Sequence, residues 1–291
     1  MNDAPAQSVG PYLEGRLRAL DARLGEVAPR LLAASPDPEA VHDLRVALRR
    51  TRVMLELARC VFGRFRCDRV RRALRDIQRA TGELRDEEVI LGLAETVPQP
   101  PPDVESWLAL HRRRERSLRR ALVRRIEAGD LERARHLLDA LLAFGTDPSR
   151  DQPLGRFAGR SIARARRRVE RRRRARLDDP HALHELRLGY KRLRYVAEAL
   201  TPTPSLEQAS LAQTASRMQS RLGSVHDIDV TVACIRRARS LCAETKQRLL
   251  GALESLRQER VTAYVSENER RARDTSPHDA GGNSLRKTST R

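Results

Sequence analysis

Cationic side chains recur at three- and four-residue intervals in this 291-residue chain, first at His42, Arg45, Arg49 and Arg52. A helix advances by about 100° per residue, so these four side chains fall within an arc of about 80° on one helix face. Guanidinium groups donate paired hydrogen bonds to phosphate oxygens and remain charged near neutral pH. The spacing therefore predicts a helix face that binds a phosphate-rich anion.

A second segment repeats this pattern with His184, Arg187, Lys191 and Arg194, and Tyr195 lies beside them. Stacked cations repel one another by a few tenths of a kcal/mol per pair, roughly, and no acids are interleaved here. A linear polyphosphate would offset the repulsion, because its closely spaced oxygens can bridge successive arginines. Each histidine could donate a hydrogen bond and gain charge beside the anion. The alternative is a basic face exposed only to solvent.

The two segments belong to an internal duplication, in which residues 36–57 align with 178–199 and residues 78–89 with 219–230. His42, Arg45, Arg50 and Arg52 thereby match His184, Arg187, Arg192 and Arg194. Gln78, Gly82, Asp86 and Val89 match Gln219, Gly223, Asp227 and Val230. We expect a first repeat at about 8–146 and a second at about 153–270, related by pseudo-twofold symmetry.

The elements that position these residues are all expected to be helices, because apolar residues recur at helical spacing and no segment alternates as a strand would. Glycine and proline breakers, Gly82 and Gly223 among them, divide the chain into about eleven helices. The face opposite each cationic stripe is apolar and should be buried. These apolar residues are Leu44, Leu48, Leu55, Ala58 and Phe62, and Leu186, Tyr190, Leu193, Ala197 and Leu200. From residue 271 onward the low apolar content predicts a disordered tail.

Composition favours a polyanionic partner. Lys and Arg number 58 against 39 Asp and Glu, giving a formal charge of +19, and only Lys191, Lys246 and Lys287 are lysines. Such a field attracts nucleic acid, polyphosphate or anionic lipid. An aromatic content of 3 % argues against recognition of unpaired bases by stacking. The four cysteines match no zinc or redox spacing, so we expect reduced thiols. With neither a signal peptide nor a membrane span apparent, the protein is expected in the cytoplasm.

Three motifs resemble those of the CHAD (conserved histidine α-helical domain) family. H-x-x-R-V-x-x-R-R-x-R at 42–52 and H-x-L-R-x-x-x-K-R-L-R-Y at 184–195, followed by Glu198, resemble its two signature helices. L-G-x-x-x-D-x-D-V at 222–230 is similar to its second motif. The resemblance covers about residues 8–270. It implies two four-helix-type bundles around a basic central groove or tunnel that binds inorganic polyphosphate, and targeting to polyphosphate granules in some members. Because the residues before 36 leave no room for the acid-rich domain that often precedes this one in the family, we expect a stand-alone version.

The resemblance also implies which residues line that groove. They are His42, Arg45, Arg49, Arg50, Arg52, His184, Arg187, Lys191, Arg192 and Arg194. Secondary candidates are Arg75, Arg79, Arg85, Arg217, Arg221, His226 and Tyr195. The first repeat departs from the family pattern at Glu87 and Glu88, and Val53 stands where the second has Tyr195. Asp86 and Asp227 are expected to cap a helix or orient an arginine.

Other functions remain open at this stage. Arginine-rich helices also contact duplex nucleic acid without sequence discrimination, and a basic face could dock on a granule or membrane surface. The dipeptides His42-Asp43 and His226-Asp227 suggest a metal-dependent phosphohydrolase, but the cationic stripes would repel the metal. A phosphohistidine relay would need a kinase-like or receiver-like element. We therefore expect no catalysis, no cofactor and no metal. Periodicity does not reveal whether the two stripes face each other.

Overall fold

The protein is described here by a computed structural model, which covers residues 7–33, 37, 39–96, 101–173, 176–200 and 206–275. These residues form nine α-helices, one 3-10 helix and no β-strand, which confirms the all-α prediction. The helices are α1 (Val9–Leu32), α2 (Ala40–Phe62), α3 (Arg64–Glu95), α4 (Pro102–Glu127), α5 (Asp130–Ala143), η1 (Pro148–Arg150), α6 (Leu154–Arg172), α7 (Pro180–Ala199), α8 (Leu206–Arg237) and α9 (Ala243–Thr275).

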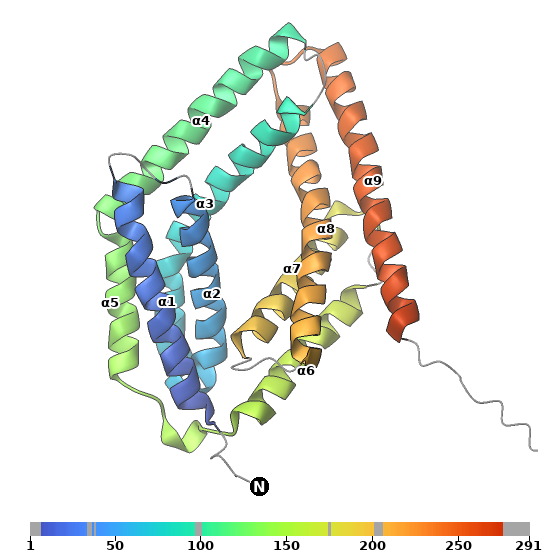
Figure 1. The fold of residues 1–291 in the computed structure, drawn as a ribbon. Helices are drawn as coiled ribbons and strands as arrows, with labels where there is room; N and C mark the ends of the chain where they lie inside the picture. Colours follow the sequence, from blue (N-terminus) through green and yellow to red (C-terminus); the bar gives the residue numbers. More distant parts are fainter. Residues whose placement is uncertain are drawn as a thin grey trace, which may run out of the picture.

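The duplication is visible in the helix order, because α1–α5 come from the first repeat and α6–α9 from the second. Equivalent helices contact one another across the molecule, α2 with α7 and α3 with α8. In Figure 1, α4 and the C-terminal half of α3 run from the α1, α2 and α5 group to the top of the view, where they meet the ends of α8 and α9. The two motif helices, α2 and α7, therefore lie at the contact between the repeats.

Two of the expected helix breaks do not occur, which explains why the described residues form fewer helices than predicted. Gly82 lies inside α3 and Gly223 inside α8, each a helix of 32 residues. A glycine costs a helix about 1 kcal/mol, and buried neighbours such as Leu84 and Leu222 offset that cost by packing. Gly63, with φ at +86°, does separate α2 from α3.

The C-terminal boundary also differs from the expected one. Helix α9 continues to Thr275, so the first five residues of the expected tail are helical. The remainder, residues 276–291, lies outside the described residues.

The apolar stripes of α2 and α7 are buried, as the sequence predicts. Leu44, Leu48, Leu55 and Ala58 are fully enclosed in the larger core, and Leu186 of α7 is 1 % exposed. This core takes residues from both repeats. The packing fixes α2 and α7 with their opposite, cationic faces directed away from the core.

A second, smaller core, here called the tip core, joins the far ends of α3, α4, α8 and α9 (Figure 1). Ile90, Trp107, Ile228 and Leu249 are among its buried members. At its edge the Asp103 carboxylate of α4 accepts a hydrogen bond from the Cys242 backbone N–H at 2.9 Å. Because both cores draw on both repeats, the two halves form one packed body. Within the described ranges, no helix is both long and apolar enough to cross a membrane.

Candidate polyanion-binding site

Cations from α2 and α7 converge between the two repeats, so the two stripes do face each other. We define the central cationic cluster as Arg45, Arg49, Arg52, Arg187 and Lys191. Burial and, to a lesser degree, the charges of the four arginines together lower the pKa of Lys191 to about 7, as expected for an ammonium group held among like charges from both helices. Arg49 of α2 also donates a hydrogen bond to the Tyr195 hydroxyl of α7 at 2.8 Å.

The arginines of the cluster are partly removed from water. Burial is the main cause of the lowered pKa of Arg45 and of its repeat equivalent Arg187. Arg45 Nη1 donates to the Thr81 carbonyl at 3.2 Å, and Arg52 donates to Gln78. The Nε atoms of Arg52 and Arg187 are buried without a hydrogen-bond partner. Buried, unsatisfied donors carrying positive charge are costly, and an anion at this position would satisfy them.

Two equivalent carboxylates, Asp86 of α3 and Asp227 of α8, stand close to Arg45 and Arg187. Loss of hydration raises the pKa of both carboxyl groups, although Asp86 keeps part of its surface in solvent, and the arginines oppose the shift. Both residues lie in helix interiors, so the expected capping role is wrong. The alternative role, in which each aspartate orients a neighbouring arginine, agrees with their positions beside Arg45 and Arg187.

Three other residues named by the resemblance bind carboxylates instead. Arg192 donates to Glu56 at 2.6 Å, joining the second repeat to the first. The equivalent pair, Arg50 and Glu198, lies at 3.7 Å, and Arg194 donates to the same Glu198 at 2.6 Å. The two cross-repeat pairs are related by the pseudo-twofold symmetry.

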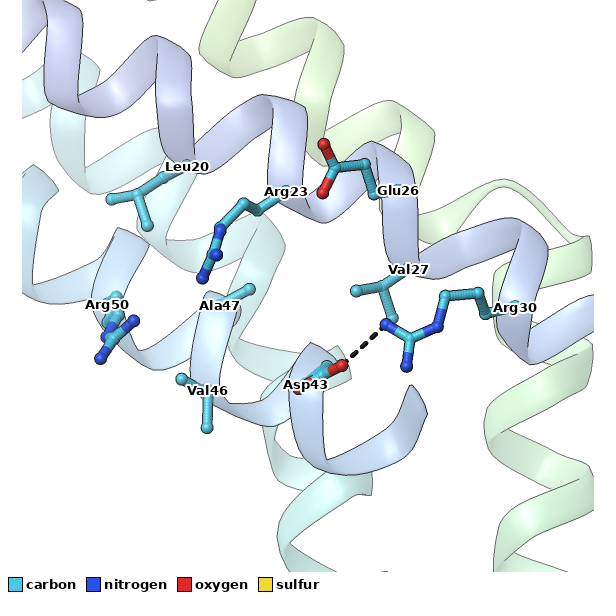
Figure 2. A pocket seen from close by; sticks show the side chains of 9 residues that line it. All are labelled: Leu20, Arg23, Glu26, Val27, Arg30, Asp43, Val46, Ala47 and Arg50. Atoms are coloured by element: carbon cyan, nitrogen blue, oxygen red, sulfur yellow. Dashed lines mark hydrogen bonds and ion pairs between the residues drawn. The ribbon is translucent and has the colours of Figure 1, made fainter. Parts of the chain in front are cut away.

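Arg50 also lines a pocket between α1 and α2. Figure 2 shows it with Arg23, Arg30 and Asp43, and Arg30 donates to Asp43 at 2.7 Å. The lining of this pocket includes no member of the central cationic cluster, and it includes two carboxylates, Asp43 and Glu26. It is therefore a less favourable place for a polyanion.

The motif histidines differ in their surroundings. His42 is exposed. Its equivalent, His184, lies with Nδ1 at 3.2 Å from Nδ1 of His226, and the ring centroids are 4.6 Å apart. Burial and the neighbouring Arg187 lower the pKa of both histidines, that of His226 to about 4. The pair is consequently neutral near pH 7 when no anion is bound.

The secondary candidates divide into two groups. His226, Tyr195, Arg85 and Arg75 lie near members of the cluster: Arg85 affects the pKa of Arg45, and Arg75 that of Arg52. Arg85 and Arg75 are nevertheless exposed, and each also lies 3.7 Å from a carboxylate, Glu88 and Asp76 respectively. The second group is three exposed arginines that pair with carboxylates: Arg79 with Glu83, and Arg217 and Arg221 with Glu267.

Sequence reasoning missed Arg71 of α3. Its charge lowers the pKa of Arg52, and its own Nε is buried without a partner, while its terminal nitrogens pair with Asp68 at 3.0 Å and Glu56 at 3.8 Å. Residue 71 lies between the two aligned blocks, whose offsets place Ala212 or Gln213 opposite it, so comparison of the repeats gave no signal for a cation there.

The CHAD domain family model matches residues 12–236, which is more than half of the chain. The chain belongs to the CHAD family. Among solved structures, this CHAD protein is similar to the CHAD domain from the plant Ricinus communis, with a TM-score of 0.71 and 20 % identity over 91 % of this chain and 96 % of that one. It is also similar to PptA from Streptomyces chartreusis, with a TM-score of 0.67 and 18 % identity over 92 % of this chain and 100 % of that one. These similarities establish the shared fold. The sequence matches no curated protein.

Proposed function

We propose that this CHAD domain binds inorganic polyphosphate at the central cationic cluster and does not transform it. The observation that carries the proposal is the convergence of five cations from both repeats, none of which forms an ion pair among the described residues. In contrast, neighbouring arginines such as Arg192 are neutralised by carboxylates. A bound polyanion would offset the repulsion within the cluster and satisfy its buried donors.

The partial burial of the cluster favours a thin polyanion over a duplex. A DNA duplex is contacted through broad, exposed basic surfaces that neutralise many phosphates at once. Arg45, Arg187 and Lys191 are each partly buried, and this burial is the main cause of their lowered pKa. A single polyphosphate strand presents oxygens on all sides and can reach such recessed groups.

The surroundings of the histidines argue for binding without hydrolysis. A metal-dependent phosphohydrolase needs several ligands converging on a cation. His184 and His226 lie beside Arg187 and Lys191, whose charges would repel a divalent cation. Within the described part of the chain, no group of three or more His, Cys, Asp or Glu side chains is arranged to hold a metal ion.

The test is a competition experiment. Binding of labelled long-chain polyphosphate is measured at ~150 mM salt, where exposed charges are screened over about 8 Å, and is challenged with duplex DNA at equal phosphate concentration. The wild type should prefer polyphosphate, and Arg45→Ala/Arg187→Ala should lose most of that preference. The matched control is Arg113→Ala/Arg116→Ala, which removes two exposed charges from α4 and should retain it. Equal competition by DNA, or equal losses in both double variants, would favour a general electrostatic attraction.

The same proposal extends to the cell, where the protein would be cytoplasmic and would collect at polyphosphate granules. A fluorescent fusion of the wild type should form foci only in cells that accumulate polyphosphate. The Arg45→Ala/Arg187→Ala fusion should remain diffuse in the same cells.

A further inference from the structure

A cysteine, a histidine and a glutamate from three different helices form a chain of contacts at the tip core. Nδ1 of His111 on α4 lies 2.6 Å from the Glu87 carboxylate of α3. Nε2 of the same ring lies 3.7 Å from the sulfur of Cys234 on α8. Trp107 packs against the imidazole with ring centroids 4.4 Å apart. The central cationic cluster uses none of these residues.

The order of contacts fixes what each group can do. Glu87 is 4 % exposed, and its second oxygen pairs with Arg114 at 2.8 Å, which leaves the first oxygen to accept the N–H at Nδ1. Nε2 is then free to take the thiol proton of Cys234. The contacts with Cys234 and Glu87 raise the pKa of His111 to about 9, which favours its protonated form. The charged or titratable groups that contact the His111 ring are Glu87 and Cys234, and Arg114 contacts Glu87 in turn.

The other three cysteines have different partners and serve as internal comparisons. Cys67 is fully buried, and burial raises the pKa of its thiol to about 12. Burial also raises the pKa of Cys60, whose sulfur donates to the Leu57 carbonyl. Cys242 is exposed and contacts Thr245. Cys234 is only partly buried, so part of the residue is in contact with solvent.

We propose that Cys234 is a reactive thiolate that hydroperoxides oxidise, with His111 as its proton acceptor and donor and Glu87 as a positioning residue. Proton transfer from Cys234 to His111 creates a thiolate and an imidazolium. The thiolate attacks the terminal oxygen of the hydroperoxide, the S–O bond forms and the O–O bond breaks. The leaving alkoxide takes the proton from His111. Sulfur is oxidised by two electrons to the sulfenic acid, and the hydroperoxide is reduced to an alcohol or, from hydrogen peroxide, to water.

The first experiment measures the alkylation rate of each cysteine with iodoacetamide in the reduced, full-length protein, by peptide mass spectrometry between pH 5 and 9. At pH 6 Cys234 should react at least about tenfold faster than the exposed Cys242, because a larger fraction of it is thiolate. A Cys234 rate that rises only at pH ~8.5, as for an ordinary thiol, would overturn the proposal without any variant.

Variants then test the roles of the two partners. His111→Asn should reduce the Cys234 rate at pH 6 to that of Cys242, whereas the control His136→Asn, on the exposed face of α5, should leave it unchanged. Glu87→Gln should move the midpoint of the pH profile upward, which a loss of packing alone would not do.

Oxidation is tested separately: after treatment with hydrogen peroxide, dimedone, which traps sulfenic acids, should label Cys234 before Cys242. An unchanged rate in folded His111→Asn, checked by circular dichroism, contradicts the assignment. This inference does not rest on polyphosphate binding.

Discussion

Lys191 differs from the other members of the central cationic cluster because it can lose its charge near neutral pH. Burial and four arginines lower its pKa to about 7. An unfolded lysine binds its proton much more tightly, so the ligand-free protein loses stability from this residue as pH falls from about 10 towards 7. A bound polyanion has the opposite effect, because it stabilises the charged form and raises the pKa.

We therefore predict that polyphosphate binding takes up a proton at Lys191. Affinity should strengthen as pH falls from 9 to 7, by up to about tenfold per pH unit, in binding titrations at constant ionic strength. Lys191→Arg keeps its charge throughout this range and should show a flatter dependence. Lys246→Arg, at a site distant in sequence from the motifs, should behave as the wild type. Parallel pH curves for the wild type and Lys191→Arg would contradict the prediction.

At the scale of helices, the contact between α2 and α7 is held by two ion pairs that the pseudo-twofold symmetry relates. Arg192 with Glu56 is the closer, at 2.6 Å with about 28 % and 29 % of the two side chains exposed. Arg50 with Glu198 is longer, at 3.7 Å. The pairs fix the spacing of the motif helices and thereby the distance between Arg45 and Arg187.

We predict that the closer pair contributes measurably to stability. In a double-mutant cycle of Glu56→Ala and Arg192→Ala, urea unfolding should give a coupling energy of about 1 kcal/mol, as for partly buried pairs with good geometry. The cycle of Glu198→Ala and Arg50→Ala should give less, because the distance is longer. A larger coupling in the second cycle would show that the 2.6 Å contact is not the dominant one in solution.

Features that depend on a single helix, such as which of its side chains are buried, could be predicted from the sequence. The apolar stripe ending at Leu55, Ala58 and Phe62 is buried because helical periodicity alone determines which side chains share a face. Gly82 and Gly223 were misinterpreted as breaks because propensity is weaker than the packing of two 32-residue helices.

Contacts between helices were beyond the reach of periodicity. Arg49 and Arg50 are adjacent in the basic segment, yet they contact different residues of the second repeat. Arg50 pairs with Glu198, and Arg49 donates a hydrogen bond to Tyr195. Arg71 has no counterpart in the second repeat, and His111 and Cys234 are far apart in sequence. Such pairings follow from how the repeats dock, which no single-helix pattern encodes.

At the scale of the molecule, a formal charge of +19 attracts any polyanion, so affinity alone does not identify the site. Its salt dependence is more informative. Arg45→Ala/Arg187→Ala should lower the slope of log affinity against log salt by about two, or about one for each arginine that no longer binds a phosphate. Arg113→Ala/Arg116→Ala should leave the slope nearly unchanged. The slopes are measured by fluorescence anisotropy from ~50 to ~300 mM salt. Equal changes of slope in both double variants would indicate that no local site exists.

The pseudo-twofold relation of Arg45 to Arg187 and of Asp86 to Asp227 concerns the direction in which a bound polymer runs. A nucleic acid strand has a 5′ and a 3′ end and presents different groups when reversed. Linear polyphosphate reads the same from either end, so a site with two matching halves can receive it in both directions. Two equivalent orientations favour binding by RT ln 2, or about 0.4 kcal/mol. The two repeats differ at some equivalent positions, with His226 in place of Arg85 and Tyr195 in place of Val53. If such differences make the polymer bind better in one direction, this contribution becomes smaller.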